Sequence, residues 1–339
     1  MEKFNNYYES VEVATSKKYL KVCGYDISLM APFEIDMASF DSVSSDIPST
    51  SMDSIDESDD VVGFDGCVEF VESEQDKLVW SEDAKRLSIF GKVEHYKKGY
   101  ALIYKGVQVA EYLRQMDGQI TTHGSAVRFP NGKAVIIMGN SGAGKTSTAI
   151  SLCKNYGAEL IGNDQVIFDI KDGLKVVGGT KDLIVRKKIT QQNFPELAHL
   201  FDSKENSWKS KRRLKPADLD INICDEPTEV CAVVWLHLDS DQDELTHMKK
   251  IDSSDIVDSL NISERLSRQI SGVQSPLIDD SGSIRSFGLS LDNDITRKNR
   301  LSAIEKFRET GIYYIFSSKL EDVSESIKHL TEFKEEKND

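Results

Sequence analysis

The sequence predicts an α/β protein with a β-rich N-terminal region. Two observations support this prediction: short apolar segments separated by turn residues dominate before Gln119, and strand-like and helix-like segments alternate after it. We therefore expect two parts, a β-rich region over residues 1–118 and an α/β domain over residues 119–339.

The N-terminal region is predicted to contain strands that are partly antiparallel. The candidate strands are YLKVCG, DISLM, CVEFVE, RLSIFGKV and YALIYKG, and VQVAEYLRQM is expected to form a short helix. Residues 37–60 are rich in Ser and Asp and contain few large apolar side chains. Such a segment buries little surface, so we expect an acidic flexible loop there, with a partner-binding role as the alternative.

The α/β domain is expected to begin with the strand ITTHGSAVRF, a tight turn at Asn131-Gly132 and the buried strand KAVIIMG. The next segment, KTSTAISLCKNYG, has the pattern of a helix that ends at Gly157. The remaining predictions are strands at AELIG, QVIFDI and EVCAVVWLHLD, helices over 253–269 and 297–310, and a final strand and helix at GIYYIF and VSESIKHLTEF.

Composition excludes several classes of function. The formal net charge of -15 argues against nucleic-acid binding, which needs a basic surface. Apolar runs are too short to span a bilayer, and the N-terminal residues lack an apolar signal core. The five cysteines are scattered without metal-ligand spacing, which is typical of reduced thiols in a cytoplasmic protein. The sequence leaves a homo-oligomeric state open.

Residues 139–147, GNSGAGKTS, match the full P-loop pattern between a predicted strand and a predicted helix. Glycines allow backbone N–H groups to approach phosphate oxygens, and the N-terminus of the helix favours negative charge. Lys145 is expected to reach the β- and γ-phosphates of ATP, and the Thr146 hydroxyl to bind Mg²⁺. The predicted nucleotide-binding residues are Gly139, Asn140, Ser141, Gly142, Ala143, Gly144, Lys145, Thr146, Ser147 and Arg186. A dinucleotide-binding fold is not expected, because the glycine spacing differs from GxGxxG.

A carboxylate for the metal is expected at Asp164, about 20 residues after Lys145 and at the end of the predicted strand AELIGND. An acid at the carboxyl end of a strand would face the same crevice as the P-loop. An ordinary turn-forming Asp is the alternative reading, and Asp169 is the fallback ligand.

The order His123-Gly124, GNSGAGKT and LIGND resembles HPr kinase/phosphorylase and the wider group related to phosphoenolpyruvate carboxykinase. The resemblance covers about residues 119–170 and implies a P-loop kinase core with a mixed sheet. It also implies ATP-dependent phosphoryl transfer with Mg²⁺ to a hydroxyl or carboxylate acceptor. By position, His123 would lie beside the transferred phosphate and Asp164 would be the metal-binding or base carboxylate, so His123, Asp164 and Lys145 are the candidate catalytic residues.

Two departures from the family pattern affect this reading. Asn163 stands where the family has the first of two acids, which leaves Asp164 as the only carboxylate of the pair. The downstream glycine-rich signature that belongs to recognition of HPr is absent, so we expect a different protein, peptide or small molecule as acceptor. Arg186 is expected near the γ-phosphate, and the basic stretch from Lys209 to Lys215 is read as a solvated surface or as a clamp for an anionic substrate.

Two alternatives to a kinase follow from the same residues. The loss of one acid favours a regulatory module that binds ATP as a switch without kinase chemistry. A decarboxylating carboxykinase needs further metal ligands, which we do not find in the sequence.

Overall fold

The structure is a computed structural model with two compact units. It describes residues 16–22, 24–43, 50–54, 63–202, 204, 210–239, 246–251, 256–272 and 275–332. The first unit groups Met1–Asp117 with Ser267–Lys298, and the second groups Gly118–Leu266 with Asn299–Asp339. The division at 117/118 lies next to the expected boundary, but the expected single domain over 119–339 is interrupted. The reason is that Ile270, Leu277 and Leu291 are buried in the core of the first unit.

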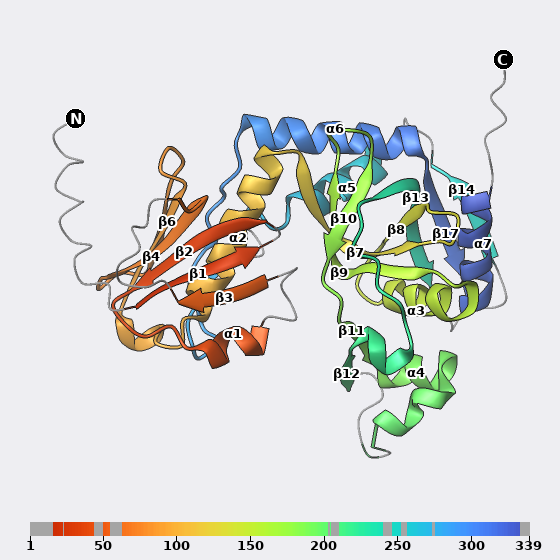
Figure 1. Ribbon diagram of the computed structural model, residues 1–339, viewed down its shortest axis with the longest axis horizontal. Helices are drawn as coiled ribbons and strands as arrows, with labels where there is room; N and C mark the ends of the chain where they lie inside the picture. Colours follow the sequence, from red (N-terminus) through yellow and green to blue (C-terminus); the bar gives the residue numbers. More distant parts are fainter. Residues whose placement is uncertain are drawn as a thin grey trace. The chain divides into compact units, whose positions relative to one another are not determined.

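The first unit is built on a six-stranded sheet in the order β3-β1-β2-β4-β6-β5. The strands are β1 (Ser16–Val22), β2 (Tyr25–Ala31), β3 (Thr50–Ser54), β4 (Gly66–Glu72), β5 (Lys77–Ser81) and β6 (Arg86–Gly91). Both parallel pairs, β2–β4 and β4–β6, lie in the middle of the sheet, and the outer pairs are antiparallel. Helix α2 (Tyr100–Met116) packs along one face (Figure 1). The unit also contains α1 (Met37–Val43), a 3₁₀ turn at Val93–His95, and the short pair β15 (Leu277–Ile278) and β16 (Ile284–Ser286).

Two predictions for this region were wrong. The segment YALIYKG forms the first half of α2 and not a strand, because buried residues such as Leu102, Val109 and Leu113 recur at helical spacing against the sheet. The segment 37–60 is not a uniform loop, because α1 and β3 lie within it. Phe40 and Met52 are buried in the core. The parts of the expected loop at 44–49 and 55–60 lie outside the described residues.

The second unit is built on a seven-stranded mixed sheet in the order β10-β9-β7-β8-β13-β17-β14, with β10 also pairing with β13. Strands β8, β13 and β17 run parallel to one another, and the other neighbouring pairs are antiparallel. The strands are β7 (Gln119–Arg128), β8 (Ala134–Met138), β9 (Glu159–Asp169), β10 (Lys175–Gly179), β13 (Thr228–Leu238), β14 (Thr246–Lys250) and β17 (Ile312–Ser317).

Helices cover both faces of this sheet (Figure 1). Along β8, Val135 and Ile137 contribute to one core cluster and Ile136 and Met138 to the other, as strand alternation requires. The first cluster contains α3 (Lys145–Tyr156) and α7 (Leu320–Glu332), and the second contains α5 (Ile256–Ser267) and α6 (Asp294–Thr310). The first residues of α6 belong to the first unit.

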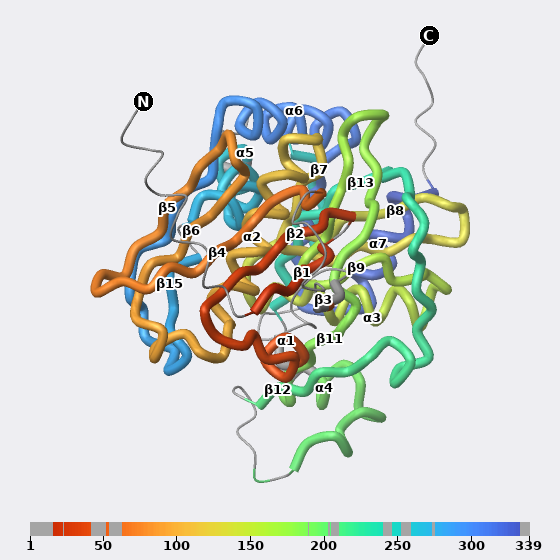
Figure 2. Tube along the Cα trace, turned by 60° about the vertical axis from the view of Figure 1, so that its left-hand side comes forward, coloured from red at the N-terminus to blue at the C-terminus, as the bar shows by residue number. Residues whose placement is uncertain are grey.

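A small antiparallel pair, β11 (Leu183–Arg186) and β12 (Lys211–Leu214), is separate from the main sheet. Helix α4 (Lys187–Asn193) follows β11 directly and lies beside it in both views (Figures 1 and 2). Short 3₁₀ helices occupy Pro195–Leu200 and Pro216–Leu219. Because β11 also contacts α3, the pair is held close to the loop that precedes that helix.

The glycine-rich loop joins β8 to α3, as the sequence predicted, and α3 ends at Gly157 with a positive φ of 67°. The predicted strands AELIG and QVIFDI form one continuous strand, β9. Among the described residues, no helix has the length and hydropathy needed to cross a membrane. Cys67, Cys153, Cys224 and Cys231 are free thiols.

Candidate functional site

The glycine-rich loop adopts a conformation that only glycine accommodates at two of its positions. Gly139 has φ of 145°, and a Cβ atom there would lie 2.5 Å from the Leu236 carbonyl oxygen. Gly144 has φ of 89°, and a Cβ atom there would lie 2.8 Å from the Leu238 side chain. The loop is therefore seated closely against β13, where the Ala143 carbonyl also accepts a hydrogen bond from the Leu238 amide (3.1 Å).

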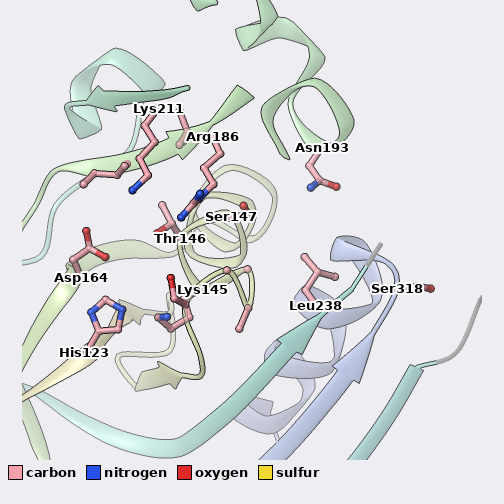
Figure 3. Close-up of a pocket in the computed structure, with 16 residues that line it drawn as sticks. His123, Lys145, Thr146, Ser147, Asp164, Arg186, Asn193, Lys211, Leu238 and Ser318 are labelled. Carbon is pink, nitrogen blue, oxygen red and sulfur yellow. The ribbon is translucent and has the colours of Figure 1, made fainter. Parts of the chain in front are cut away.

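A cavity of about 260 Å³ opens above this loop (Figure 3). Its floor is Ser141 to Ser147, and residues from several other elements of the second unit complete the wall. The further lining residues are His123, Asp164, Ile184, Val185, Arg186, Asn193, Lys211, Leu238 and Ser318. Gly139 and Asn140, which were also predicted to bind nucleotide, are not among the lining residues, and their carbonyl oxygens accept hydrogen bonds from Lys145 Nζ.

Lys145 is the first residue of α3 and is buried, with 7% of its surface exposed. Its Nζ donates to the carbonyl oxygens of Gly139 (3.1 Å) and Asn140 (3.0 Å). No side chain caps the N-terminus of α3, because Gly144 occupies the capping position. The first-turn amides and the Lys145 ammonium thus form a positively polarised floor suited to an anion.

Asn163 fixes the position of the Thr146 hydroxyl. Asn163 is fully buried, and its Oδ1 accepts hydrogen bonds from Thr146 Oγ1 (3.0 Å) and Ser125 Oγ (2.8 Å). Its Nδ2 donates to the Asp182 carbonyl (2.9 Å). A Thr hydroxyl that donates its proton keeps its oxygen lone pairs for another partner, so this arrangement suits Thr146 as a metal ligand.

Asp164 lines the cavity as predicted, but its expected place at a strand end was wrong. It lies within β9, where regular alternation would direct it to the face opposite Asn163 and Gln165. Instead its φ is 62°, a left-handed conformation that is rare for a residue other than glycine. The carboxylate therefore lies on the same side as His123, which pairs with Gln165 across β7 and β9 (Figure 3). Backbone strain of this kind clusters at functional sites.

The fallback ligand Asp169 does not reach the cavity. It ends β9, where its carboxylate accepts hydrogen bonds from Gln119 Nε2 (3.1 Å) and the Lys171 amide (2.7 Å). Among the described residues there is no group of three or more His, Cys, Asp or Glu that would hold a metal ion unaided. Mg²⁺ bound through one carboxylate, one hydroxyl and substrate phosphates needs no such group.

Arg186 lies on the wall of the cavity, at the end of β11. Lys181, two residues before β11, does not line the cavity. Its Nζ is held by the Ile161 carbonyl (2.7 Å) and the Asp225 carboxylate (2.8 Å).

Sequence reasoning missed several residues of the cavity. Leu238 and Ser318 lie at the carboxyl ends of β13 and β17, which become neighbours of the loop only because these strands run parallel beside β8. Arg265 of α5 supports the loop from behind, with its Nη2 donating to Asn140 Oδ1 (2.6 Å) and its guanidinium over the Trp235 ring. No local sequence signal identifies these residues, because they depend on strand order.

Comparisons with models of known protein families and with curated proteins found no match. We therefore infer the function from the residues around the cavity.

Proposed function

We propose that the protein is an ATP-dependent phosphotransferase with a P-loop core of the HPr kinase type. It would phosphorylate a hydroxyl of a protein, peptide or small molecule other than HPr. The observation that supports this most strongly is that Lys145, Thr146, Asp164 and His123 line one cavity above the glycine-rich loop. A loop that only binds phosphate would not require an acid and a histidine beside it.

The floor of the cavity would hold the polyphosphate of ATP. The amides of the loop and of the first turn of α3 offer hydrogen bonds to phosphate oxygens, and the Lys145 ammonium adds a charge. Thr146 and Asp164 would hold Mg²⁺, which neutralises charge on the phosphate oxygens when bound. In that state Lys145 would exchange its bonds to the Gly139 and Asn140 carbonyls for bonds to phosphate.

The chemistry would be an in-line displacement. The acceptor oxygen forms a bond to the γ-phosphorus, the bond from that phosphorus to the β–γ bridging oxygen breaks, and ADP leaves. The hydroxyl proton passes to the Asp164 carboxylate, and His123 beside it donates a hydrogen bond to the transferred group. Because phosphoryl transfer depends mainly on positioning and charge neutralisation, one carboxylate suffices for this scheme.

An ATP-binding switch without transfer is the second candidate. It is favoured by Asn163, whose amide makes three side-chain hydrogen bonds and leaves the site one acid short of the family pattern. In this case Asp164 would bind metal only.

Single-turnover reactions with γ-labelled ATP test the proposal. Wild type, Lys145→Ala and Asp164→Asn are incubated with Mg²⁺ and pools of hydroxyl-bearing peptides and metabolites. We expect label transfer by wild type and its loss in both variants. Tight ATP binding without transfer to any acceptor would favour the switch, and label transfer that is unaffected by Asp164→Asn would exclude the proposed base.

A further inference from the structure

The pair β11–β12 presents two different faces. Leu183 and Val185 of β11 and Leu214 of β12 are buried in the core cluster that contains α3. Ile184, Arg186 and Lys211, at the alternate positions of the pair, line the cavity, and Val185 also reaches the lining from the buried face. The apolar face thus anchors the pair, and its other face forms a wall of the cavity.

Arg186 and Lys211 are directly paired across the two strands. Side chains at such positions have Cβ atoms about 5 Å apart, and like charges there destabilise the pair. In Figure 3 both side chains extend from the wall toward Thr146, on the side of the cavity opposite Lys145. Asp164 and His123 lie together at one end of the cavity. An anion that lies between the two side chains would be attracted by both positive charges.

Three neighbouring basic residues, none of which lines the cavity, make side-chain contacts elsewhere. Lys187 Nζ donates to the Asp202 carbonyl (2.7 Å), and Arg212 lies over the Phe201 ring. Arg213 is 4.0 Å from the Asp182 carboxylate. Of this basic group, Arg186 and Lys211 are the two whose side chains line the cavity, so the structure separates them from a merely solvated basic stretch.

The cavity therefore has two cationic regions. Lys145 and the loop amides form the floor, and Arg186 and Lys211 form the facing wall. We propose that the wall is a subsite for an oxyanion of the acceptor, with Lys211 as its anchor and Arg186 bordering both this anion and the nucleotide. The acceptor is then a molecule whose hydroxyl lies close to a phosphate or a carboxylate. This inference rests on the proposed function, because it concerns the acceptor of the same site.

The test measures a second anion on nucleotide-loaded protein at constant ionic strength. Protein saturated with Mg²⁺ and a non-hydrolysable ATP analogue is titrated by NMR with inorganic phosphate and, separately, with succinate. We expect saturable binding of one of these probes, which identifies the anion as phosphate or carboxylate. Lys211→Ala should weaken it at least tenfold, and Lys211→Arg should restore it. Lys215→Ala is the matched control, because this exposed lysine follows β12 outside the cavity lining and its loss changes the net charge equally.

Three outcomes would overturn the subsite. The first is that neither probe saturates wild type, and the second is that both probes bind wild type and Lys211→Ala equally. The third is that Lys211→Ala weakens binding of the ATP analogue as much as binding of the probe, which would assign Lys211 to the nucleotide. Failure of the analogue to bind wild type would instead contradict the proposed function. The same phosphate and succinate titrations without nucleotide would then still test the subsite.

Discussion

Replacement of Asn163 by Ala tests whether this residue organises the floor of the site. The side chain makes three hydrogen bonds, to Ser125, Thr146 and the Asp182 carbonyl, and it is fully buried. Each such bond contributes about 1 kcal/mol net, and the partners left unsatisfied in the interior add to the loss. We therefore expect the free energy of unfolding to fall by about 4 kcal/mol in Asn163→Ala.

Urea denaturation followed by circular dichroism measures this change. Asn155→Ala is the control, because Asn155 is exposed and makes one side-chain hydrogen bond, to Ser151 Oγ (3.2 Å). It should lose less than about 1 kcal/mol. Asn163→Ala should also weaken the Mg²⁺ dependence of ATP binding, since the Thr146 hydroxyl loses its acceptor. Equal stability of the two variants would refute the role assigned to Asn163.

Three further predictions concern other parts of the chain. Phe40→Ala should lower the free energy of unfolding by about 3 kcal/mol, seen as a fall in Tm, because the Phe40 side chain is buried. The sequence predicted a loop for this segment, and an unchanged Tm would contradict the burial. Burial lowers the pKa of Lys105 from 10.5 to about 8, so the folded protein releases this proton at lower pH than the unfolded chain. The free energy of unfolding therefore rises with pH between these two pKa values. The unfolding free energy of wild type relative to Lys105→Met should therefore rise by about 2 kcal/mol from pH 7.5 to 9.5 in denaturant titrations, whereas a constant difference would exclude the shift. Gly139→Ala should lower ATP affinity at least tenfold in calorimetric titrations. Gly142→Ala should lower it far less, because Gly142 also has a positive φ but a Cβ atom there meets no atom within 4 Å. Equal effects of the two substitutions would argue against close packing of the loop on β13.

Local patterns in the sequence predicted the elements that depend on local chemistry. The strand before the glycine-rich loop, the helix after it and the end of that helix at Gly157 follow from apolar periodicity and glycine placement, and the structure confirms them. The structure places Lys145, Thr146, Asp164 and His123, four of the predicted site residues, around one cavity, and their roles stay predictions.

Features that depend on tertiary contacts were not predictable in the same way. The segment YALIYKG alternates locally like a strand, but packing against the first sheet makes it helical. The return of residues 267–298 to the first unit depends on long-range burial of Ile270 and Leu291. Lys211 belongs to a basic stretch, and its pairing with Arg186 beside the cavity depends on strand contacts that the local sequence does not reveal.

The most direct test of the central claim is calorimetric titration of MgATP into wild type and Lys145→Ala, with melting curves to establish that both are folded. The account predicts one-site, Mg²⁺-dependent binding to wild type and an affinity at least tenfold lower in the variant, a loss of about 1.4 kcal/mol or more. Absence of binding to wild type, or equal affinity in the two proteins, would contradict the assignment of the glycine-rich loop as a polyphosphate site.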